Sequence, residues 1–313
     1  MNYHEALEYL YPLIRYGTKL GLDNIAELLS RIGNPHRSLR IVHVAGSKGK
    51  GSVCAFLSSI LKEAGYRVGT FTSPHLIDFT ERIRVDWEQI PRREVAHYAS
   101  ELRPIAEEMA SYSIVKSPSF FEMTLAMALK YFEDMGVDLA VLEAGMGGRY
   151  DATNVVDSVL AVITHLTMEH SEHLGRSLAR IAKEKAGIIK DKIPVVLSEK
   201  SEVIERYCKE KNCDLTILGE NIRFGRESFS TSGQHFWVEN GKRRRFHIPL
   251  LGNYQIQNAA AAFASVQELN TLGYDICEEV IESGFEKTSW PARLHLLKEN
   301  PIVVVDSTHD AEG

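Results

Sequence analysis

The segment Ile41–Ser52, with the sequence IVHVAGSKGKGS, decides the fold. It opens as a buried strand and continues through glycines into the start of a helix. Free backbone N–H groups and the helix dipole favour an anion at such a helix start, and glycine lets the backbone approach that anion closely. Lys50 can then reach a terminal phosphate, and Ser52 can place a hydroxyl on Mg²⁺. The segment therefore predicts a phosphate-binding loop over Gly46–Ser52.

The spacing of this loop differs from the common nucleotide-binding pattern. The P-loop, G-x-x-x-x-G-K-[ST], has a wider glycine spacing and no residue between its lysine and its Ser/Thr. An ordinary glycine turn between a strand and a helix is the alternative interpretation. Two lysines, Lys48 and Lys50, together with a serine at the helix start, favour phosphate over a plain turn.

Strand-like and helix-like segments alternate along the chain. Residues 137–145 (VDLAVLEAG) and 158–166 (SVLAVITHL) are apolar runs typical of buried parallel strands. The alternation predicts an α/β fold with a doubly wound, mainly parallel sheet. The expected strands are 41–45, 66–72, 137–145, 158–166 and 193–198, and the expected helices are 3–16, 22–32, 50–64, 92–112, 120–135, 177–189, 201–211, 255–271 and 275–287.

The pattern changes after about residue 218. Alternating residues around Asn240-Gly241, a strong hairpin signal, predict a small antiparallel β appendage at about 218–250. The chain then closes on NPIVVVDSTHDAEG (300–313), a strand and a polar loop of the kind that opens an α/β domain. We interpret residues 1–295 as one domain and residues 296–313 as a linker and the first strand of a truncated second domain. Because that strand lacks its sheet, residues 301–313 are expected to be mobile or docked irregularly.

Composition narrows the class of protein. The 313 residues carry a net charge of −6, which argues against a general nucleic-acid binder, and we interpret the basic run KRRR (242–245) as a solvated hairpin face. The four cysteines lack metal-site spacing and are expected to be free thiols in a reducing cytoplasm. The N-terminus does not resemble a signal peptide, and no apolar run is long enough to span a membrane.

Polar groups follow two further strands. Glu143 lies near the end of a predicted buried strand, where open α/β sheets gather ligands, although a salt-bridged strand-end acid is the simpler alternative. Arg149, Asp151 and Asn154 follow in one polar loop, which indicates ligand contacts. His170, beside Glu169, follows the next strand; His173 is three residues away and competes with it for the same role. Lys185, beside Glu184 on a helix, has the pattern of a solvated surface charge.

Together these stretches resemble a known family. The carrying motifs are GLDNI, HVAGSKGKGS, TSPHL, SFFEMT, LEAGMGGRYDATN, EHSEHLG, IAKEKAGII, LLGNYQIQNAAAA, WPARL and VVVDSTHDAEG, in that order. The chain resembles the bacterial folylpolyglutamate synthase / dihydrofolate synthase family, within the Mur-ligase-like ATP-dependent amide ligases. The resemblance implies ligation of L-glutamate to folate or dihydropteroate through an acyl phosphate, with ATP and two Mg²⁺ ions as cofactors. It also implies a cytoplasmic monomer with a C-terminal Rossmann-like domain, which this chain lacks.

The resemblance assigns roles to individual residues. For ATP it implies contacts from Gly46, Ser47, Lys48, Gly49, Lys50, Gly51, Ser52, Gln255, Asn258, Arg293 and Asp306, with Gln255 and Asn258 near the adenine. For Mg²⁺ it implies Ser52, Glu143, His170 and Lys185, the last as a carbamate. Lys50, Lys185 and His170 are thereby the candidate catalytic residues. For the folate side it implies Asp23, Ser73, Pro74, His75, Phe120, Phe121, Glu122, Arg149, Tyr150 and Asp151.

The sequence also departs from the family pattern. Ser47-Lys48 stands where Thr-Asn is usual, Glu169 replaces Asp, Tyr254 replaces His, and DSTHDAEG, with Asp310 for Asn beside His309, replaces a run nearer to DGAHNPEG. Because much of the family's glutamate site lies in the C-terminal domain, an ATP- and pterin-binding unit without ligase turnover is one alternative function. A Mur-type amino-acid ligase with another acceptor is a second, although TSPHL and SFFEMT resemble the folate side.

Overall fold

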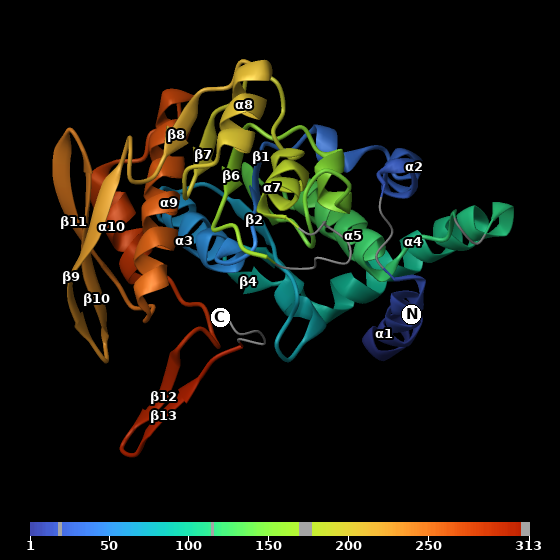
Figure 1. The fold of residues 1–313 in the computed structure, drawn as a ribbon. Coiled ribbons are helices and arrows are strands. Elements are labelled where there is room, and N and C mark those ends of the chain that lie inside the picture. Colours follow the sequence, from blue (N-terminus) through green and yellow to red (C-terminus); the bar gives the residue numbers. More distant parts are fainter. Residues whose placement is uncertain (18–20, 114–115, 169–176, 308–313) are drawn as a thin grey trace.

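A mainly parallel sheet forms the centre of the molecule, as the computed structural model shows for residues 1–17, 21–113, 116–168 and 177–307 (Figure 1). Its strands are, in sheet order, β4 (Glu88–Gln89), β3 (Ile83–Val85), β2 (Val68–Phe71), β5 (Leu139–Glu143), β1 (Ile41–Ala45), β6 (Leu160–Ile163), β7 (Val195–Leu197) and β8 (Leu215–Ile217). The strands from β2 to β8 in this order pair in parallel, which confirms the predicted doubly wound sheet.

One edge of the sheet is antiparallel, which the sequence did not predict. β3 pairs with β2 and with β4, and the turn between β3 and β4 is Asp86-Trp87. Both turn residues have positive φ, at 52° and 69°. Asn-Gly and Asp-Gly are the usual signatures of such a turn, so Asp-Trp gave no hairpin signal. β8 was also missed, because its three residues are too few for a clear pattern.

Helices cover both faces of the sheet because each strand is buried on both sides. On β1, Val42 and Val44 pack on one face, whereas Ile41 and Ala45 pack on the other. The first face is covered by α3 (Lys50–Glu63), α9 (Asn253–Thr271) and α10 (Glu278–Glu286), and the second by α5 (Phe120–Asp134), α7 (Leu178–Ala186) and α8 (Glu202–Glu210). This arrangement delivers the start of α3 to the carboxyl ends of the central strands.

The N-terminal helices extend the layer around α5. They are α1 (Tyr3–Leu10), α2 (Asp23–Arg31) and α4 (Arg92–Tyr112). The chain also forms short 3₁₀ segments, which are η1 (Tyr11–Tyr16), η2 (Pro35–Arg37), η3 (Phe79–Arg82) and η5 (Ala152–Val155). The expected single helix over 3–16 changes to a 3₁₀ turn at Tyr11. Pro12 explains the change, because proline cannot donate the backbone hydrogen bond that would continue the α-helix.

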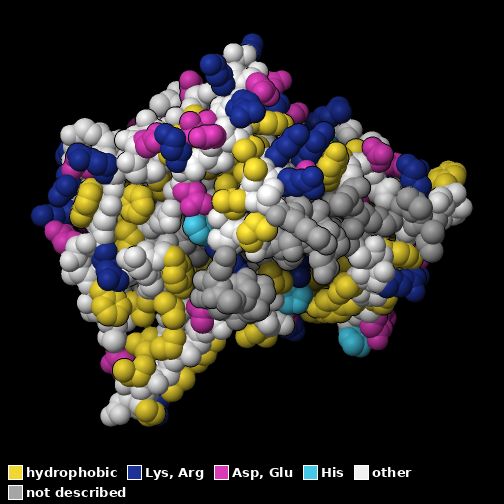
Figure 2. Space-filling view, viewed as in Figure 1, with side chains coloured by type: hydrophobic (Ala, Val, Ile, Leu, Met, Phe, Trp, Pro, Cys, Tyr) yellow, Lys and Arg dark blue, Asp and Glu magenta, His cyan; other side chains and the backbone are white. Residues whose placement is uncertain are grey.

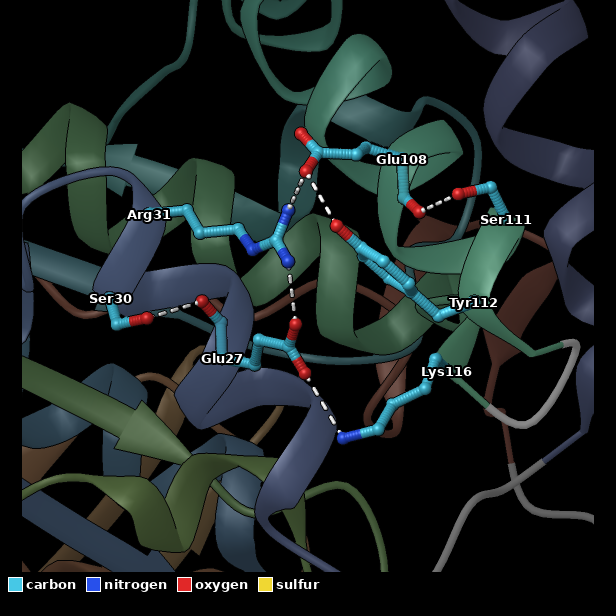
Figure 3. Close-up of polar contacts among 7 residues, drawn as sticks. All are labelled: Glu27, Ser30, Arg31, Glu108, Ser111, Tyr112 and Lys116. Atoms are coloured by element: carbon cyan, nitrogen blue, oxygen red, sulfur yellow. Dashed lines mark hydrogen bonds and ion pairs between the residues drawn. The ribbon is translucent and has the colours of Figure 1, made fainter.

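A polar clamp joins α2 to α4 and to the residues after α4 (Figure 3). Arg31 pairs with Glu27 on its own helix at 2.7 Å and with Glu108 on α4 at 3.1 Å. Lys116 reaches Glu27 from beyond α4 at 3.1 Å, and the Tyr112 hydroxyl donates to Glu108 at 3.2 Å. The clamp fixes α2, whose first residue is Asp23.

The predicted β appendage is present. It consists of β9 (Arg223–Ser230), β10 (Gly233–Asn240) and β11 (Lys242–Ile248), which pair antiparallel and lie against α9 and α10 (Figure 1). The KRRR run lies on β11, as expected for a hairpin face, and its charges are paired. The pairs are Lys242–Glu278, Arg243–Glu239, Arg244–Glu278 and Arg245–Glu227.

The expectation of an irregular segment after residue 300 is wrong for residues 302–305. β13 (Ile302–Val305) pairs antiparallel with β12 (His295–Glu299), a strand that the sequence did not predict. Figure 1 shows this hairpin projecting from the body of the molecule, and Figure 2 shows hydrophobic side chains along it. Leu297, Ile302 and Val304 are 58%, 69% and 45% exposed.

Two general expectations can be compared with the structure. Cys54, Cys208, Cys213 and Cys277 are all free thiols, as predicted. Within the described ranges, no helix is both long enough and apolar enough to cross a membrane.

Candidate active site

The glycine loop lies at the point where the order of the parallel strands reverses. β1 pairs with β5 on one side, with Val44 opposite Glu143, and with β6 on the other, with Ala45 opposite Ile163. Ligands of open α/β sheets bind beyond the carboxyl ends of the strands at such a point. The sequence therefore placed the candidate phosphate loop correctly in the topology.

Long-range contacts fix the first half of the loop. The backbone N–H groups of Ser47 and Lys48 donate to the His165 carbonyl at 2.8 and 3.3 Å. The Ser47 hydroxyl also donates to the Thr167 carbonyl at 3.1 Å. The backbone N–H groups of Ser47 and Lys48 are thus used in hydrogen bonds to the segment that follows β6.

The second half of the loop opens toward the ligand side. The first hydrogen bond of α3 runs from Val53 N–H to the Gly49 carbonyl at 2.9 Å. The N–H groups of Lys50, Gly51 and Ser52 therefore occupy the open end of this helix, where an anion is favoured. The amides of this loop that could meet a phosphate therefore lie in its second half.

Gly49 is required by its conformation and by its neighbour. Its φ is +90°, a left-handed value, and a Cβ atom built on it would overlap the Asn258 side chain. The Asn258 amide donates to Gln255 at 2.9 Å, and the Gln255 amide donates to the Ser52 hydroxyl at 3.1 Å. Gln255 and Asn258, expected near the adenine, thus support the glycine loop directly; we call this group, Gly46–Ser52 with Gln255 and Asn258, the nucleotide edge.

Lys50 and Glu143 bring opposite charges to this edge. The Lys50 ammonium donates to the carbonyls of Gly46 and Ser47 at 2.9 and 3.2 Å, which curls it over the loop. Glu143 is 6% exposed, and its carboxylate accepts from Ser73 N–H at 2.9 Å. Burial raises the pKa of Glu143, while the nearby charges of Lys50, Arg293 and Arg82 act to lower it. A buried carboxylate in this setting is suited to a bound cation.

Lys185 is buried, so the reading of it as a solvated surface charge is wrong. Its side chain is 1% exposed near the end of α7. The loop after β5 covers that helix end: Arg149 N–H donates to the Glu184 carbonyl at 2.8 Å, and the Asn154 amide donates to the Gly187 carbonyl at 3.0 Å. A loop distant in sequence, rather than the helix pattern, therefore determines the burial of Lys185.

Asp151 anchors the same loop from within. It is 7% exposed and accepts from Met146 N–H at 2.8 Å and from Thr153 N–H at 3.0 Å. The Thr153 hydroxyl donates to Asp151 and lies 2.8 Å from His43 Nε2 on β1. Burial raises the pKa of Asp151 and lowers the pKa of His43 to about 3, so His43 is neutral at pH 7.

The predicted folate-side residues contribute to an aromatic cluster, which we define as Tyr11, His75, Phe79, Phe120 and Arg82. Phe120 stacks on Tyr11 with ring centroids 5.7 Å apart and meets Phe79 edge-on at 5.9 Å. The Arg82 guanidinium lies 5.1 Å from the centre of the Phe120 ring and donates to His75 Nδ1 at 2.7 Å. Tyr11, Phe79 and Arg82 were missed from sequence. The Asp78-x-x-Glu81 capping box before Arg82 was the available signal, because it predicts a helical turn that ends at the strand.

The other folate-side candidates are more dispersed. Glu122 caps its own helix, accepting from Ser119 N–H at 2.7 Å. Phe121 packs against Phe71 and close to Gly145. Tyr150 is 40% exposed beside the Arg149 guanidinium, and Asp23 is exposed at the first turn of α2. Ser73, followed by Pro74 and His75, is the one of these that directly touches Glu143, through its backbone.

Arg293 and Asp306 flank the C-terminal hairpin, just before β12 and just after β13. The Arg293 guanidinium donates to the Ser307 hydroxyl at 2.6 Å, and Asp306 accepts from Leu294 N–H at 2.7 Å. These contacts tie together the two ends of the β12–β13 hairpin. The positive charge of Arg293 also acts to lower the pKa of Glu143.

Some of the metal ligands expected from the sequence lie outside the residues that the structure describes. Glu169, His170, His173, His309 and Asp310 lie in ranges that the structure does not describe. Among the described residues, no group of three or more His, Cys, Asp or Glu side chains is placed to hold a metal ion. Ser52 and Glu143 are both buried, Ser52 in the nucleotide edge and Glu143 opposite Val44 of β1. Hydroxyl and carboxylate oxygens are donors that Mg²⁺ accepts.

Comparison with known proteins decides the family. The Mur ligase middle domain matches residues 44–266. The dihydrofolate synthase/folylpolyglutamate synthase of Bacillus subtilis is 36% identical over 319 residues, covering 99% of this chain and 74% of that protein. The chain belongs to the folylpolyglutamate synthase / dihydrofolate synthase family.

Other members of this synthase family agree in sequence and in fold. The folylpolyglutamate synthase of Lacticaseibacillus casei is 33% identical, covering 100% of this chain and 75% of that protein. A solved complex of FPGS with AMPPCP has a TM-score of 0.93 at 31% identity, covering 100% of this chain and 78% of the other. Escherichia coli FolC in complex with DHPP and ADP has a TM-score of 0.85 at 30% identity, covering 99% and 72%. The predicted family membership is therefore confirmed.

Proposed function

We propose that this chain catalyses ATP-dependent ligation of L-glutamate to folate or dihydropteroate. The observation that carries the proposal is the nucleotide edge, where Lys50 and the open end of α3 lie beside the buried Glu143 in a member of the synthase family. ATP and a folate-type acceptor are supported as ligands by relatives solved with AMPPCP, with AMPPCP and folate, and with DHPP and ADP.

The reaction has two steps. An acceptor carboxylate oxygen attacks the γ-phosphorus of ATP; the bond from that phosphorus to the β,γ-bridging oxygen breaks, giving an acyl phosphate and ADP. The glutamate amine then attacks the acyl carbon, loses a proton and expels inorganic phosphate. Lys50 and Arg293 would offset the charge on the transferred phosphoryl oxygens, and the amides of Lys50, Gly51 and Ser52 would orient them.

We propose that Mg²⁺, as two ions, is held by Ser52, Glu143, His170 and a carbamylated Lys185. Carbamylation joins the neutral Lys185 amine to CO₂ and releases a proton, so that a cation becomes an anion. The burial of Lys185 supports this, because a buried ammonium is costly and its neutral form is the one that reacts. Bound Mg²⁺ would neutralise charge on the ATP phosphates.

On the acceptor side, we propose that the aromatic cluster and the loop Arg149–Asp151 bind the pterin and its carboxylate end. Stacked rings offer flat apolar surface, and the Arg82 guanidinium offers positive charge. Asp23, Ser73, Pro74, Phe121 and Glu122 would complete this side, while the adenine would lie near Gln255 and Asn258 and the ribose near Asp306.

We further propose that residues 1–295 form the ATP-binding domain and that residues 296–313 begin the part of the protein that holds glutamate. The relatives extend beyond the matched length, since the chain covers 74% and 75% of two of them. A cytoplasmic monomer is the state that we propose for it.

Hydroxylamine trapping tests the first step without the glutamate site. The 313-residue chain is incubated with ATP, Mg²⁺ and dihydropteroate or tetrahydrofolate, and hydroxylamine converts any acyl phosphate into a hydroxamate. We expect a hydroxamate that requires both ATP and acceptor and disappears in Lys50→Ala. Nucleotide binding without hydroxamate from either acceptor would overturn the ligase proposal in favour of a binding unit. A hydroxamate formed only with a peptidoglycan-type carboxylate would favour a Mur-type ligase.

A further inference from the structure

A surface hollow lies away from the nucleotide edge, between the second half of α3, the β3–β4 hairpin and the segment that follows α10. Its volume is about 390 Å³. Lys62, Arg84 and Lys287 line it together with Trp87 and Ser289. Three basic side chains in one hollow point to a ligand of negative charge.

Arg84 is the unusual member of this lining. It is 9% exposed, and its guanidinium lies 5.4 Å from the centre of the Trp87 ring and 5.3 Å from that of Trp290. Across the described part of the chain, its side chain makes no ion pair and no hydrogen bond. Buried arginines are normally paired, so a guanidinium that meets only two ring faces and opens on a hollow is poised for an anion.

The neighbouring carboxylates are committed to other partners. Glu81, which influences Arg84 electrostatically, accepts from the backbone N–H groups of Leu76, Ile77 and Asp78 at 2.7–2.8 Å. Glu63, on the wall of the hollow, pairs with Lys287 at 2.6 Å and accepts from Ser283 at 2.9 Å. Neither carboxylate therefore serves as the counter-ion of Arg84.

The turn that carries Trp87 has a left-handed backbone at both of its central residues. Trp87 has φ of +69°, a left-handed value that bulky residues rarely adopt. Asp86 secures the turn by accepting from Val68 N–H at 2.8 Å and donating its own N–H to the Val68 carbonyl at 2.9 Å. The hairpin therefore fixes the position of the Trp87 side chain on the wall of the hollow.

We propose that this hollow binds a small oxyanion, a phosphate or carboxylate group, with Arg84 as its buried anchor. A guanidinium presents two parallel N–H donors that match such a group, and the rings of Trp87 and Trp290 hold its plane in place. Lys62 adds positive charge at the rim, where Lys287 is paired with Glu63, and Ser289 adds a hydroxyl.

Trp290 also separates this hollow from the nucleotide edge. A Cβ atom built on Gly51 would lie 3.1 Å from the Trp290 ring, so the indole packs directly on the glycine loop. Trp87 lines the hollow, whereas Trp237 lies on the β appendage under Arg243. The three tryptophans therefore report on the hollow (Trp87), on both places (Trp290) and on neither (Trp237).

The test is a titration of ¹⁵N-labelled protein with inorganic phosphate, following the three indole N–H signals at constant ionic strength. Glutarate replaces phosphate in a second titration and separates a phosphate source from a carboxylate source. We expect a saturable shift of the Trp87 signal with at least one of them, and none with chloride. The shift should vanish in Arg84→Met. In Lys62→Ala the anion affinity obtained from the titration should fall about three- to fivefold. Arg67→Ala, an exposed arginine outside the hollow, should bind as the natural chain does.

Four results would overturn the proposal. In three of them the Trp87 signal moves without saturating, moves equally in Arg84→Met and in the natural chain, or moves together with the Trp237 signal. A shift confined to Trp290 would place the anion at the glycine loop instead of the hollow. Lys62 is exposed, so Lys62→Ala keeps the measurement decisive even if Arg84→Met fails to fold.

Discussion

The nucleotide edge and the aromatic cluster are built by different means. The nucleotide edge is made of backbone: glycines, a helix start and carbonyls hold Lys50 and Ser52 in place. The aromatic cluster is made of side chains, in which rings stack and Arg82 joins Phe120 to His75. A site made of backbone tolerates few substitutions, but a short sequence motif reveals it. A site made of side chains is assembled from distant segments, and single substitutions change its ligand affinity by smaller steps.

Lys50→Ala should break the nucleotide edge most severely. Its ammonium is held over the loop by the carbonyls of Gly46 and Ser47. Removing one such charge from a phosphoryl-transfer site typically costs about a hundredfold or more in rate. Lys48→Ala should cost less, because the Lys48 backbone is tied to His165 and stays in place without the side chain. ATP affinity and hydroxamate formation measure both variants. ATP affinities in the reverse order would contradict the assignment of Lys50.

Gly49→Ala should destabilise the fold by about 2–4 kcal/mol, from left-handed strain plus overlap with Asn258. Gly65→Ala is the matched control at the other end of α3, since Gly65 has φ of +86° with open space around it. We expect about 1–2 kcal/mol for Gly65→Ala, from strain alone. Urea unfolding of both variants gives the difference. Equal costs would mean that the Asn258 contact contributes nothing.

Arg82→Met should weaken the aromatic cluster while leaving the nucleotide edge intact. We expect the KM for dihydropteroate or tetrahydrofolate to rise about tenfold with an unchanged KM for ATP, because a cation–π contact and a donor to His75 are lost. Arg82→Lys should recover only part of the loss, since an ammonium cannot reproduce the flat guanidinium. A matching rise in both KM values would show that the two sites are not separable.

Asp78→Asn should have the smallest effect of these substitutions, and its effect on the free energy of unfolding should depend on pH. The Asp78 carboxylate accepts from the hydroxyls of Tyr3 and Thr80 and pairs with Arg92. Burial acts to raise its pKa, but these donors prevail and hold that pKa below its ordinary value. Its stabilisation is therefore complete above the ordinary value near 3.8 and is lost as pH falls toward the folded-state pKa.

We expect Asp78→Asn to lower the free energy of unfolding by about 1 kcal/mol at pH 7, discounted for the partial exposure of the carboxylate. The gap between variant and natural chain should narrow below about pH 4. Urea unfolding at several pH values measures it. A gap that widened in acid would contradict the sign of the pKa shift.

The sequence was informative where the signal is local. The glycine loop, the central strands and the Asn240-Gly241 hairpin depend on neighbouring residues, and the structure confirms each. The β3–β4 hairpin was missed because Asp86-Trp87 replaces the usual turn residues, and only pairing with β2 stabilises it.

The sequence failed where tertiary contacts override a local pattern. Lys185 has the helix pattern of a surface lysine but is covered by the loop that contains Arg149 and Asn154. Arg82 and Arg84 are two residues apart on adjoining elements, yet one joins the aromatic cluster and the other lines the hollow. No spacing rule separates them, because the packing of distant rings decides the environment of each.

The β12–β13 hairpin has a practical consequence for the protein in solution. Valine and isoleucine side chains point to both of its faces, and Val303, Val304 and Val305 are 40%, 45% and 40% exposed. Such a strip adheres to like strips, since exposed apolar strand edges recruit further chains. Light scattering should therefore rise steeply with protein concentration. Ammonium sulfate strengthens apolar association, so Val304→Lys should stay clear at salt concentrations that cloud the natural chain.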